Sequence, residues 1–363
     1  MGMSWRAFRR VWVSVVICSK VAARRPWREG IRHIPCTLVY ILDYPATHVG
    51  PKELHGRVDM LPGLRVQRCE GVSGRSAPPP NGPGFASQSL HCRYTLGRIG
   101  TDNVVIGVPL PELQAIAKAI VVAHGMRSQF PNLRFAVSSG VGGAAAGTNM
   151  QLGDVFVSSP AHTTGGVFEF DHGKRIQGQG FIAPFKVIRP PLYWQSAIEQ
   201  VAAILKQDET YLAERVANVL KQQPDLLNEH SRPDPKSALD CVPRNDRHRE
   251  HPIVHCGLIA SASSGLDMTR ELRHELAEKG NVMCVDTTAF GTLRVLPCLV
   301  VRGFSTYEDP DENTAWQGYA ALVAAAYAKE VLACVSRETL PSWHDLQRKE
   351  LSREVEKIQL LHL

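Results

Sequence analysis

The chain has 363 residues, of which 44% are hydrophobic and 21% are charged, a balance typical of a globular protein with enough material to bury a core. Its formal net charge is +6, yet Lys and Arg outnumber Asp and Glu by 13 to 5 in residues 1–90, whereas 28 bases face 30 acids in the rest of the chain. The near-neutral body therefore offers no electrostatic case for nucleic-acid binding. Nine scattered cysteines without a CxxC pair predict neither a disulfide framework nor a zinc ribbon.

Residues 1–90 form a basic N-terminal region that contains one convincing strand, Thr37–Asp43, and ends in a Pro/Gly-rich linker near Pro78. An error in the gene model is the alternative explanation of this region. The apolar run Val11–Cys18 is too short to span a bilayer, so we expect no membrane partner. Residues 1–28 lack acids and contain several arginines, a composition shared by mitochondrial transit peptides and disordered leaders. We expect a cytoplasmic location, with a mitochondrial leader as the alternative.

A folded domain is predicted from 91–335, because strand and helix signals alternate there as in an α/β sandwich. In chain order we expect a hairpin of Tyr94–Ile99 and Asn103–Val108, a helix Glu112–Arg127, and a strand after Phe130 that runs into the glycine loop Ser138–Gly143. Next come strands Leu152–Ser158 and Val167–Phe170, a helix Leu192–Lys206, a polar, helix-containing surface insertion over 207–250, and a buried strand Ile253–Ser261. Residues 336–363 predict a C-terminal amphipathic helix that starts with a capping box at Ser342.

The most informative stretch is Val282–Ala321, which reads VMCVDTTAFGTLRVLPCLVVRGFSTYEDPDENTAWQGYAA. It predicts a buried strand, a helix start of small residues, a second apolar strand that ends in Arg302-Gly303, a polar loop and an alanine-rich helix. This resembles the nucleoside phosphorylase superfamily, which includes purine nucleoside and uridine phosphorylases and methylthioadenosine nucleosidase-like proteins. It is most similar to the phosphorylase-like domains of fungal NACHT/ankyrin-type proteins, whose matching segments read close to CFEMEAAG, PCLVIRGICDYAD and QWQGYAA. The resemblance implies a three-layer α/β/α sandwich with a mixed central sheet.

The same resemblance implies roles for the residues after the two strands. Thr288 falls on the family's ribose-binding glutamate, Thr287 on the methionine that packs on the sugar, and Asp286 on the preceding glutamate. Thr306 falls on the catalytic aspartate that protonates the base, and Glu308 lies close enough in sequence to be a weak substitute. Threonine supplies neither the charge nor the acid, and a positioned general acid contributes about 10²–10⁴ in rate.

Further substrate-binding residues come from the matching glycine turn, where Gly140, Gly142 and Gly143 would let backbone amides approach an oxyanion or a water. Phe181 matches a family phenylalanine near the base, and Ser261 matches a family serine near the base.

We therefore expect a domain that binds a purine nucleoside or a related small molecule, with N-glycosidic cleavage weak or lost; the alternative is a catalytically inactive nucleoside-sensing or signalling module. No cofactor is expected, and phosphate is a potential co-substrate, although hydrolysis is favoured because no glycine-rich phosphate loop is recognisable in residues 1–90. A homo-oligomer is the expected assembly. The cluster of His248, His251, His255 and Cys256 fits no standard zinc spacing, so we expect no metal.

Overall fold

The structure, a computed structural model, describes the regular elements and the loops that pack against them. The described residues are 10–11, 14–17, 38–42, 44–45, 64–66, 92–99, 102–109, 115–130, 133, 135–145, 150–159, 165–169, 174–176, 180–182, 187–233, 250–261, 276, 282–306 and 315–335. For the strands before residue 100, and for 174–176 and 180–182, only the backbone is described.

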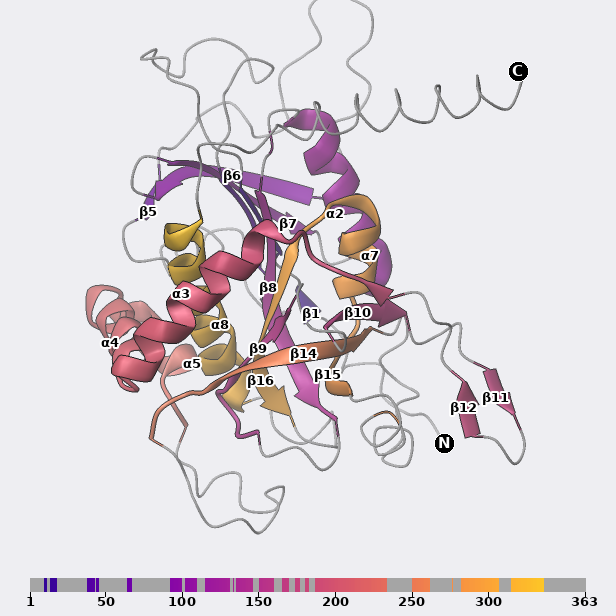
Figure 1. Ribbon diagram of the computed structural model, residues 1–363. Helices are drawn as coiled ribbons and strands as arrows, with labels where there is room; N and C mark the ends of the chain where they lie inside the picture. The colour runs from indigo at the N-terminus through magenta and orange to yellow at the C-terminus, as the bar shows by residue number, and fades with distance from the viewer. Residues whose placement is uncertain are drawn as a thin grey trace, which may run out of the picture.

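The described elements begin with a run of strands, and helices are interspersed among the strands that follow (Figure 1). The strands are β1 (Arg10–Val11), β2 (Ser14–Ile17), β3 (Leu38–Leu42), β4 (Tyr44–Pro45), β5 (Leu64–Val66), β6 (Cys92–Ile99), β7 (Asp102–Pro109), β8 (Phe135–Ala144), β9 (Val155–Ser158), β10 (Gly166–Glu169), β11 (Lys174–Ile176), β12 (Gly180–Ile182), β13 (Val187–Ile188), β14 (Val254–Ser261), β15 (Val282–Asp286) and β16 (Leu299–Thr306). The helices are α2 (Ala115–Gln129), α3 (Tyr193–Gln207), α4 (Tyr211–Gln222), the 3₁₀-helix η3 (Pro224–Leu226), α5 (Leu227–His230), α7 (Ala289–Val295) and α8 (Ala315–Cys334).

The described strands form one mixed sheet of 12 strands and two separate two-stranded sheets. In the large sheet the order is β13-β10-β14-β9-β16-β8-β2-β3-β7-β6-β5, and β15 pairs with both β14 and β8. Strand β16 runs parallel to β8 and antiparallel to β9, while β14 runs parallel to β9, β10 and β15. The mixed α/β class predicted from the sequence is therefore present.

The helices fall into two groups that lie on different sides of the central strands in Figure 1. Helix α8 packs along β16 and β8 and contacts α3, α4 and α5, whereas α2 contacts α7 and β7. The main hydrophobic core contains residues from both groups and from the sheet, among them Met126, Phe135, Trp194, Leu293 and Tyr327.

A close approach between α8 and β16 fixes the spacing of this core. A Cβ atom at Gly303 would overlap with the carbonyl oxygen of Ala320, so this strand position accepts only glycine unless the helix moves away. The alanines of α8 keep the helix surface thin at this contact, and Ala320 and Ala321 also pack on Val141 of β8. The alanine-rich composition of α8 therefore follows from its nearness to the sheet.

Most elements predicted for the body of the chain are confirmed. The hairpin is β6–β7, the predicted helix Glu112–Arg127 is α2, Leu192–Lys206 is α3, and Ile253–Ser261 is β14. The N-terminal strand predicted at Thr37–Asp43 is β3, which pairs in parallel with β7 and β8. The predicted C-terminal helix over 336–363 lies outside the described residues.

One prediction is wrong and another needs refinement. Ser138–Gly143 is not a loop: β8 continues through it to Ala144 and pairs with β16. The predicted polar insertion contains α4, whose Leu212, Val216 and Val219 are buried in the main core, so this part of 207–250 is not a surface appendage. Its apolar residues recur at helical spacing and pack against α8.

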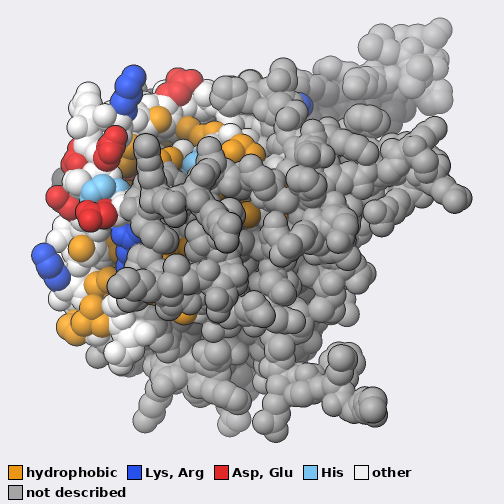
Figure 2. Space-filling view, turned by 90° about the horizontal axis from the view of Figure 1, so that it is seen from below, with side chains coloured by type: hydrophobic (Ala, Val, Ile, Leu, Met, Phe, Trp, Pro, Cys, Tyr) orange, Lys and Arg blue, Asp and Glu red, His pale blue; other side chains and the backbone are white. Residues whose placement is uncertain are grey.

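The described surface mixes charges of both signs with hydrophobic side chains, as the coloured part of Figure 2 shows. The large hydrophobic side chains that are most exposed are Leu192, Leu227 and Ile253. Within the described residues, no helix is long and apolar enough to cross a membrane.

Candidate functional site

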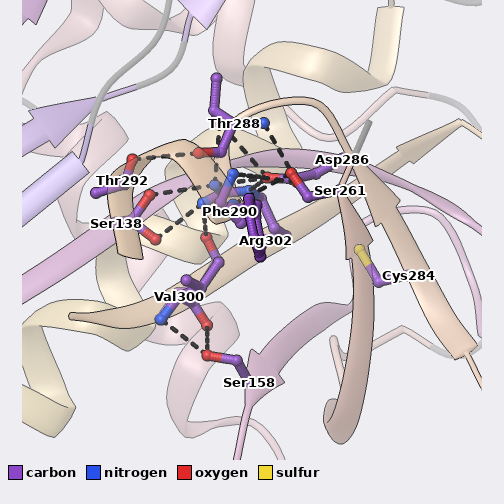
Figure 3. A network of polar contacts seen from close by, with 12 residues as sticks. Ser138, Ser158, Ser261, Cys284, Asp286, Thr288, Phe290, Thr292, Val300 and Arg302 are labelled. Atoms are coloured by element: carbon purple, nitrogen blue, oxygen red, sulfur yellow. Dashed lines mark hydrogen bonds and ion pairs between the residues drawn. The ribbon is translucent and has the colours of Figure 1, made fainter. Parts of the chain in front are cut away.

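The candidate site lies where β14 and β15 end and α7 begins, beside the middle of β16 (Figure 3). Parallel pairing places Ser261, the last residue of β14, opposite Asp286, the last residue of β15. The side chain of Arg302, from β16, extends to the same place, and Figure 3 shows its guanidinium at the centre of the polar contacts. Together with Ser138 of β8, which Arg302 contacts, four strands and one helix meet at a single buried cluster of polar groups.

Arg302 is fully engaged by groups of the protein itself. Its Nε and Nη2 atoms lie 2.8 and 2.7 Å from Oδ2 of Asp286. Nη1 donates to the backbone carbonyls of Ser138 and Val301, at 2.9 and 3.0 Å, and Nη2 donates to the Ser138 hydroxyl at 3.1 Å. A guanidinium has five N–H donors, and these contacts account for all of them. The side chain is only 1% exposed, so a ligand would have to displace an existing partner to bind it.

Asp286 holds both Arg302 and the start of α7. Its carboxylate accepts from the amide of Thr288 at 3.3 Å and from the amide of Ala289 at 3.0 and 3.2 Å. The next amide, of Phe290, donates to the Ser261 hydroxyl at 3.2 Å. The first amides of a helix have no partner within the helix, and here side chains from β14 and β15 provide the partners. Asp286 and Ser261, both predicted to bind substrate, therefore cap α7.

Thr288 is turned into this cluster. Its hydroxyl lies 3.4 Å from Nη2 of Arg302 and 3.5 Å from Oδ2 of Asp286, and the residue is 2% exposed. Thr287 and Thr306 are partly exposed, and no hydrogen bond between described residues involves their hydroxyls. The hydroxyls of Thr287 and Thr306 are thus neutral groups at partly exposed positions.

The three glycines predicted to approach a ligand are buried within β8. A Cβ at Gly142 would lie 2.8 Å from Sγ of Cys284 and 3.3 Å from Cβ of Arg302. The carbonyl oxygen of Gly142 accepts from the Ser305 hydroxyl at 3.4 Å. Gly142 therefore serves the close packing of β8 against β15 and β16. Gly140 pairs with Arg302, and Gly143 pairs with Thr306 and Val285, in the ladders that flank β8.

Two predicted site residues cannot be placed by their side chains. Glu308 lies outside the described residues. Phe181 belongs to β12, in the separate β11–β12 hairpin, of which the backbone alone is described.

The sequence interpretation missed Ser138 and Arg302. A charged residue at the end of an apolar strand was the available signal for Arg302, because buried charges are nearly always paired. Its partner Ser138 is 164 positions away in sequence, and no local pattern identifies such a contact.

Burial also changes the acid–base properties of a neighbouring thiol. Desolvation raises the pKa of Cys298 from 9.0 to about 12, although the Arg302 guanidinium opposes that rise. This thiol is neutral at physiological pH and is no candidate nucleophile, since the thiolate is the reactive form.

A second polar contact lies at the start of β9 and β14. His255 Nε2 is 2.9 Å from Oδ2 of Asp154, and Asp154 also accepts from the amides of Ile253 and Gln151, each at 2.9 Å. Because the buried carboxylate joins the segment that enters β9 to the segment that enters β14, the pair is a structural tie. Within the described residues, no group of three or more His, Cys, Asp or Glu side chains is arranged to hold a metal ion.

No family model matches the chain. Among curated proteins, it is 34% identical over 263 residues to a nucleotide-binding leucine-rich repeat (NLR)-like protein of Hyaloscypha variabilis, a match that covers 68% of the chain and 26% of the relative. The chain thus spans about a quarter of that relative's length.

Solved structures similar to the chain include two 5'-methylthioadenosine/S-adenosylhomocysteine nucleosidases. That of Neisseria meningitidis, in complex with methylthio-immucillin-A, is 12% identical with a TM-score of 0.47 and coverage of 78% of this chain and 95% of its own. That of Colwellia psychrerythraea, in complex with adenine, is 14% identical with a TM-score of 0.46 and coverage of 70% and 88%. A futalosine hydrolase of Helicobacter pylori is 13% identical with a TM-score of 0.43 and coverage of 67% and 84%.

The chain is similar to nucleosidases and to a fungal NLR-like protein. These are the two relationships that its sequence predicts. At 12–14% identity, the likeness to the solved structures concerns the fold alone.

Proposed function

We propose that this chain is a nucleoside phosphorylase-like domain that recognises a purine nucleoside or a related small molecule and has lost most or all N-glycosidic cleavage. The observation that carries the proposal is the charge of the site. Among its described residues the one carboxylate, Asp286, is bound to Arg302 and to helix amides. The two positions that bear carboxylates in the resembled family are Thr288 and Thr306, and neither hydroxyl can donate a proton to a leaving base at neutral pH.

In this proposal the mixed sheet is the middle layer of a three-layer α/β/α sandwich. The domain needs no cofactor, and phosphate is the candidate co-substrate of any residual turnover. It acts in the cytoplasm as a homo-oligomer, without a nucleic-acid or membrane partner.

A second candidate function is that of a nucleoside-sensing or signalling module within a larger protein. The match to an NLR-like protein that is almost four times longer than the matched segment supports it. The two candidates make the same prediction for ligand binding and differ in whether binding changes another domain.

The test uses the purified full-length chain with adenosine, inosine and methylthioadenosine, each with and without phosphate. We expect calorimetry to detect binding of at least one nucleoside and a base-release assay to stay at background. A turnover rate near 1 s⁻¹, an ordinary enzyme value, would overturn the loss of activity and would point to Glu308 or the adjacent Asp309. Absence of binding to all three nucleosides would overturn nucleoside recognition.

A gain-of-function series tests the same site from the other side. The double variant Thr288→Glu with Thr306→Asp should bind or hydrolyse nucleoside better than either single variant, because groups that act as one catalytic unit are strongly non-additive. Thr292→Val is the matched control and should gain nothing. It removes a buried hydroxyl of α7 whose hydrogen bond among the described residues goes to the Thr288 carbonyl, at 3.3 Å. A folded double variant without any gain would show that the scaffold alone remains.

A further inference from the structure

A tyrosine hydroxyl joins α4 to α8. Tyr211, the first residue of α4, donates to Oε2 of Glu330 on α8 at 2.8 Å and accepts from Nη2 of Arg215 at 2.7 Å. The guanidinium carbon of Arg215 lies 4.6 Å from the centre of the Tyr211 ring, and its Nε lies 3.7 Å from Oε1 of Glu330. The neutral hydroxyl therefore lies between a cation and an anion, and it supplies the proton that the anion accepts.

This contact attaches a helix whose opposite face belongs to the core. Leu212, Val216 and Val219 of α4 are buried in the main core, and α4 packs against α8. The side chain of Glu330 is 15% exposed, so water replaces the Tyr211 hydroxyl as its partner only in part. The attachment of the first turn of α4 thus depends on the charge carried by the Tyr211 oxygen.

Among the tyrosines whose side chains are described, Tyr211 has the most accessible hydroxyl. The residue is partly exposed, and the turn that precedes it contains the exposed Gln207 and Glu209. Tyr319 and Tyr327 are 5% and 1% exposed, and burial raises the pKa of the Tyr193 hydroxyl. A modifying enzyme that approaches the folded domain therefore meets Tyr211 first.

We propose that Tyr211 is a phosphorylation site and that its phosphate releases the start of α4 from α8. In the transfer, the Tyr211 oxygen forms a bond to the γ-phosphorus of ATP, and the bond between that phosphorus and the β,γ-bridging oxygen breaks. ADP leaves, and the hydroxyl proton passes to the catalytic base of a protein tyrosine kinase.

The phosphate changes the sign of the contact with Glu330. A phosphotyrosine carries a charge of about −1.5 to −2 at pH 7 and adds acceptor oxygens, so it repels the carboxylate to which the hydroxyl donates. Arg215 turns to the phosphate, because a guanidinium binds phosphate oxygens in a bidentate manner. Glu330 then loses both contacts that join it to α4.

The first experiment measures whether the folded chain accepts the phosphate. The full-length chain is incubated with ATP, Mg²⁺ and a tyrosine kinase that has been selected because it phosphorylates a synthetic peptide of residues 204–217. Mass spectrometry then gives the occupancy at each tyrosine. We expect Tyr211 to be modified in the folded chain, and Tyr319 and Tyr327 to remain unmodified. A chain left unmodified at Tyr211 by a kinase that modifies the peptide would overturn the proposal.

Hydrogen exchange measures the attachment of α4 before and after phosphorylation. A hydrogen bond to a charged group corresponds to about 10- to 100-fold in an equilibrium constant. The amides of residues 215–222 should therefore exchange about tenfold faster or more in the phosphorylated chain. Equal exchange in the two forms would show that the phosphate does not release the helix.

Three variants identify the cause of the faster exchange. Glu330→Gln removes the charge that the phosphate repels, so phosphorylation should accelerate exchange less than in the wild type, and an equal acceleration would rule out the repulsion. Glu214→Gln is the matched control, because it removes an exposed carboxylate of α4 that contacts Thr210 at 3.4 Å; its acceleration should equal that of the wild type. Tyr211→Phe should show no acceleration on treatment with the kinase, and any acceleration there would assign the effect to another residue and contradict the proposal.

Discussion

Replacement of Arg302 by Met tests the central cluster most directly. The guanidinium is 1% exposed and its partner carboxylate has no exposed surface, so Arg302→Met leaves the charge of Asp286 buried with helix amides as its remaining partners. Removal of one member of a buried ion pair costs about 3–5 kcal/mol. For a domain of 150–250 residues, each kcal/mol lowers the melting temperature by about 2–4 °C. We therefore expect the melting temperature to fall by about 6–20 °C.

Urea unfolding of the wild type, Arg302→Met, Asp286→Asn and the double variant measures this cost and its coupling. The double variant removes both charges, so its loss should be smaller than the sum of the single losses by about 1–3 kcal/mol. Arg294→Met is the matched control, because Arg294 is an exposed arginine of α7 whose guanidinium lies 5.8 Å from the centre of the Phe290 ring; it should cost less than about 0.5 kcal/mol. A loss below about 1 kcal/mol for Arg302→Met, or strict additivity in the double variant, would refute the reasoning.

Two further outcomes follow from the packing and from the buried thiol. Gly303→Ala should cost more than about 2 kcal/mol in urea unfolding, because its Cβ would overlap with the backbone of Ala320; Gly257→Ala, which meets the flexible end of Met283 at 3.0 Å, should cost clearly less, and equal losses would contradict this argument. The free energy of unfolding should fall above pH 9, because the pKa of Cys298 is 9.0 when solvated and about 12 when folded: the thiol stays neutral in the native state while the unfolded chain ionises. The contribution of the neutral thiol is fully present below pH 9 and is lost between pH 9 and about pH 12, at about 1.4 kcal/mol per pH unit. Urea unfolding at several pH values should therefore show that the free energy of unfolding declines less steeply with pH in Cys298→Ala than in the wild type. An equal slope in the two proteins would rule the effect out.

The sequence predicts most of the fold because its strands are continuous apolar runs bounded by clear turn signals. It fails at Gly140–Gly143, where glycines indicate a turn by default. In the fold, Gly142 is needed because Cys284 and Arg302 approach the backbone of β8. That requirement comes from strands more than 140 positions away and leaves no local trace. The same limit applies to Ser138, whose contact with Arg302 depends on the pairing of β8 with β16.

The predicted surface insertion over 207–250 shows a different limit, because its helix is present but one face is buried. Leu212, Val216 and Val219 recur at helical spacing, so the signal for a buried helix was present in the sequence. The many charged residues of 207–250 instead favour a surface position for the predicted helix. In the fold, polar side chains of α4 also join it to α8: Tyr211 donates to Glu330 of α8 at 2.8 Å and accepts from Arg215 of α4 at 2.7 Å.

The candidate site differs from the resembled family at positions 288 and 306, where no described contact requires a charged side chain. Position 286 carries a carboxylate, and the structure gives this group two structural tasks, the neutralisation of Arg302 and the capping of α7. Positions 288 and 306 carry threonine, and no described group depends on a charge there: Thr288 makes only long contacts of 3.4 and 3.5 Å through its hydroxyl. Since a second carboxylate beside Asp286 would have to share one arginine in a buried setting, its absence from position 288 removes an electrostatic cost. Stability thus accounts for the carboxylate that is present at position 286, and it is served by the absence of a carboxylate at position 288.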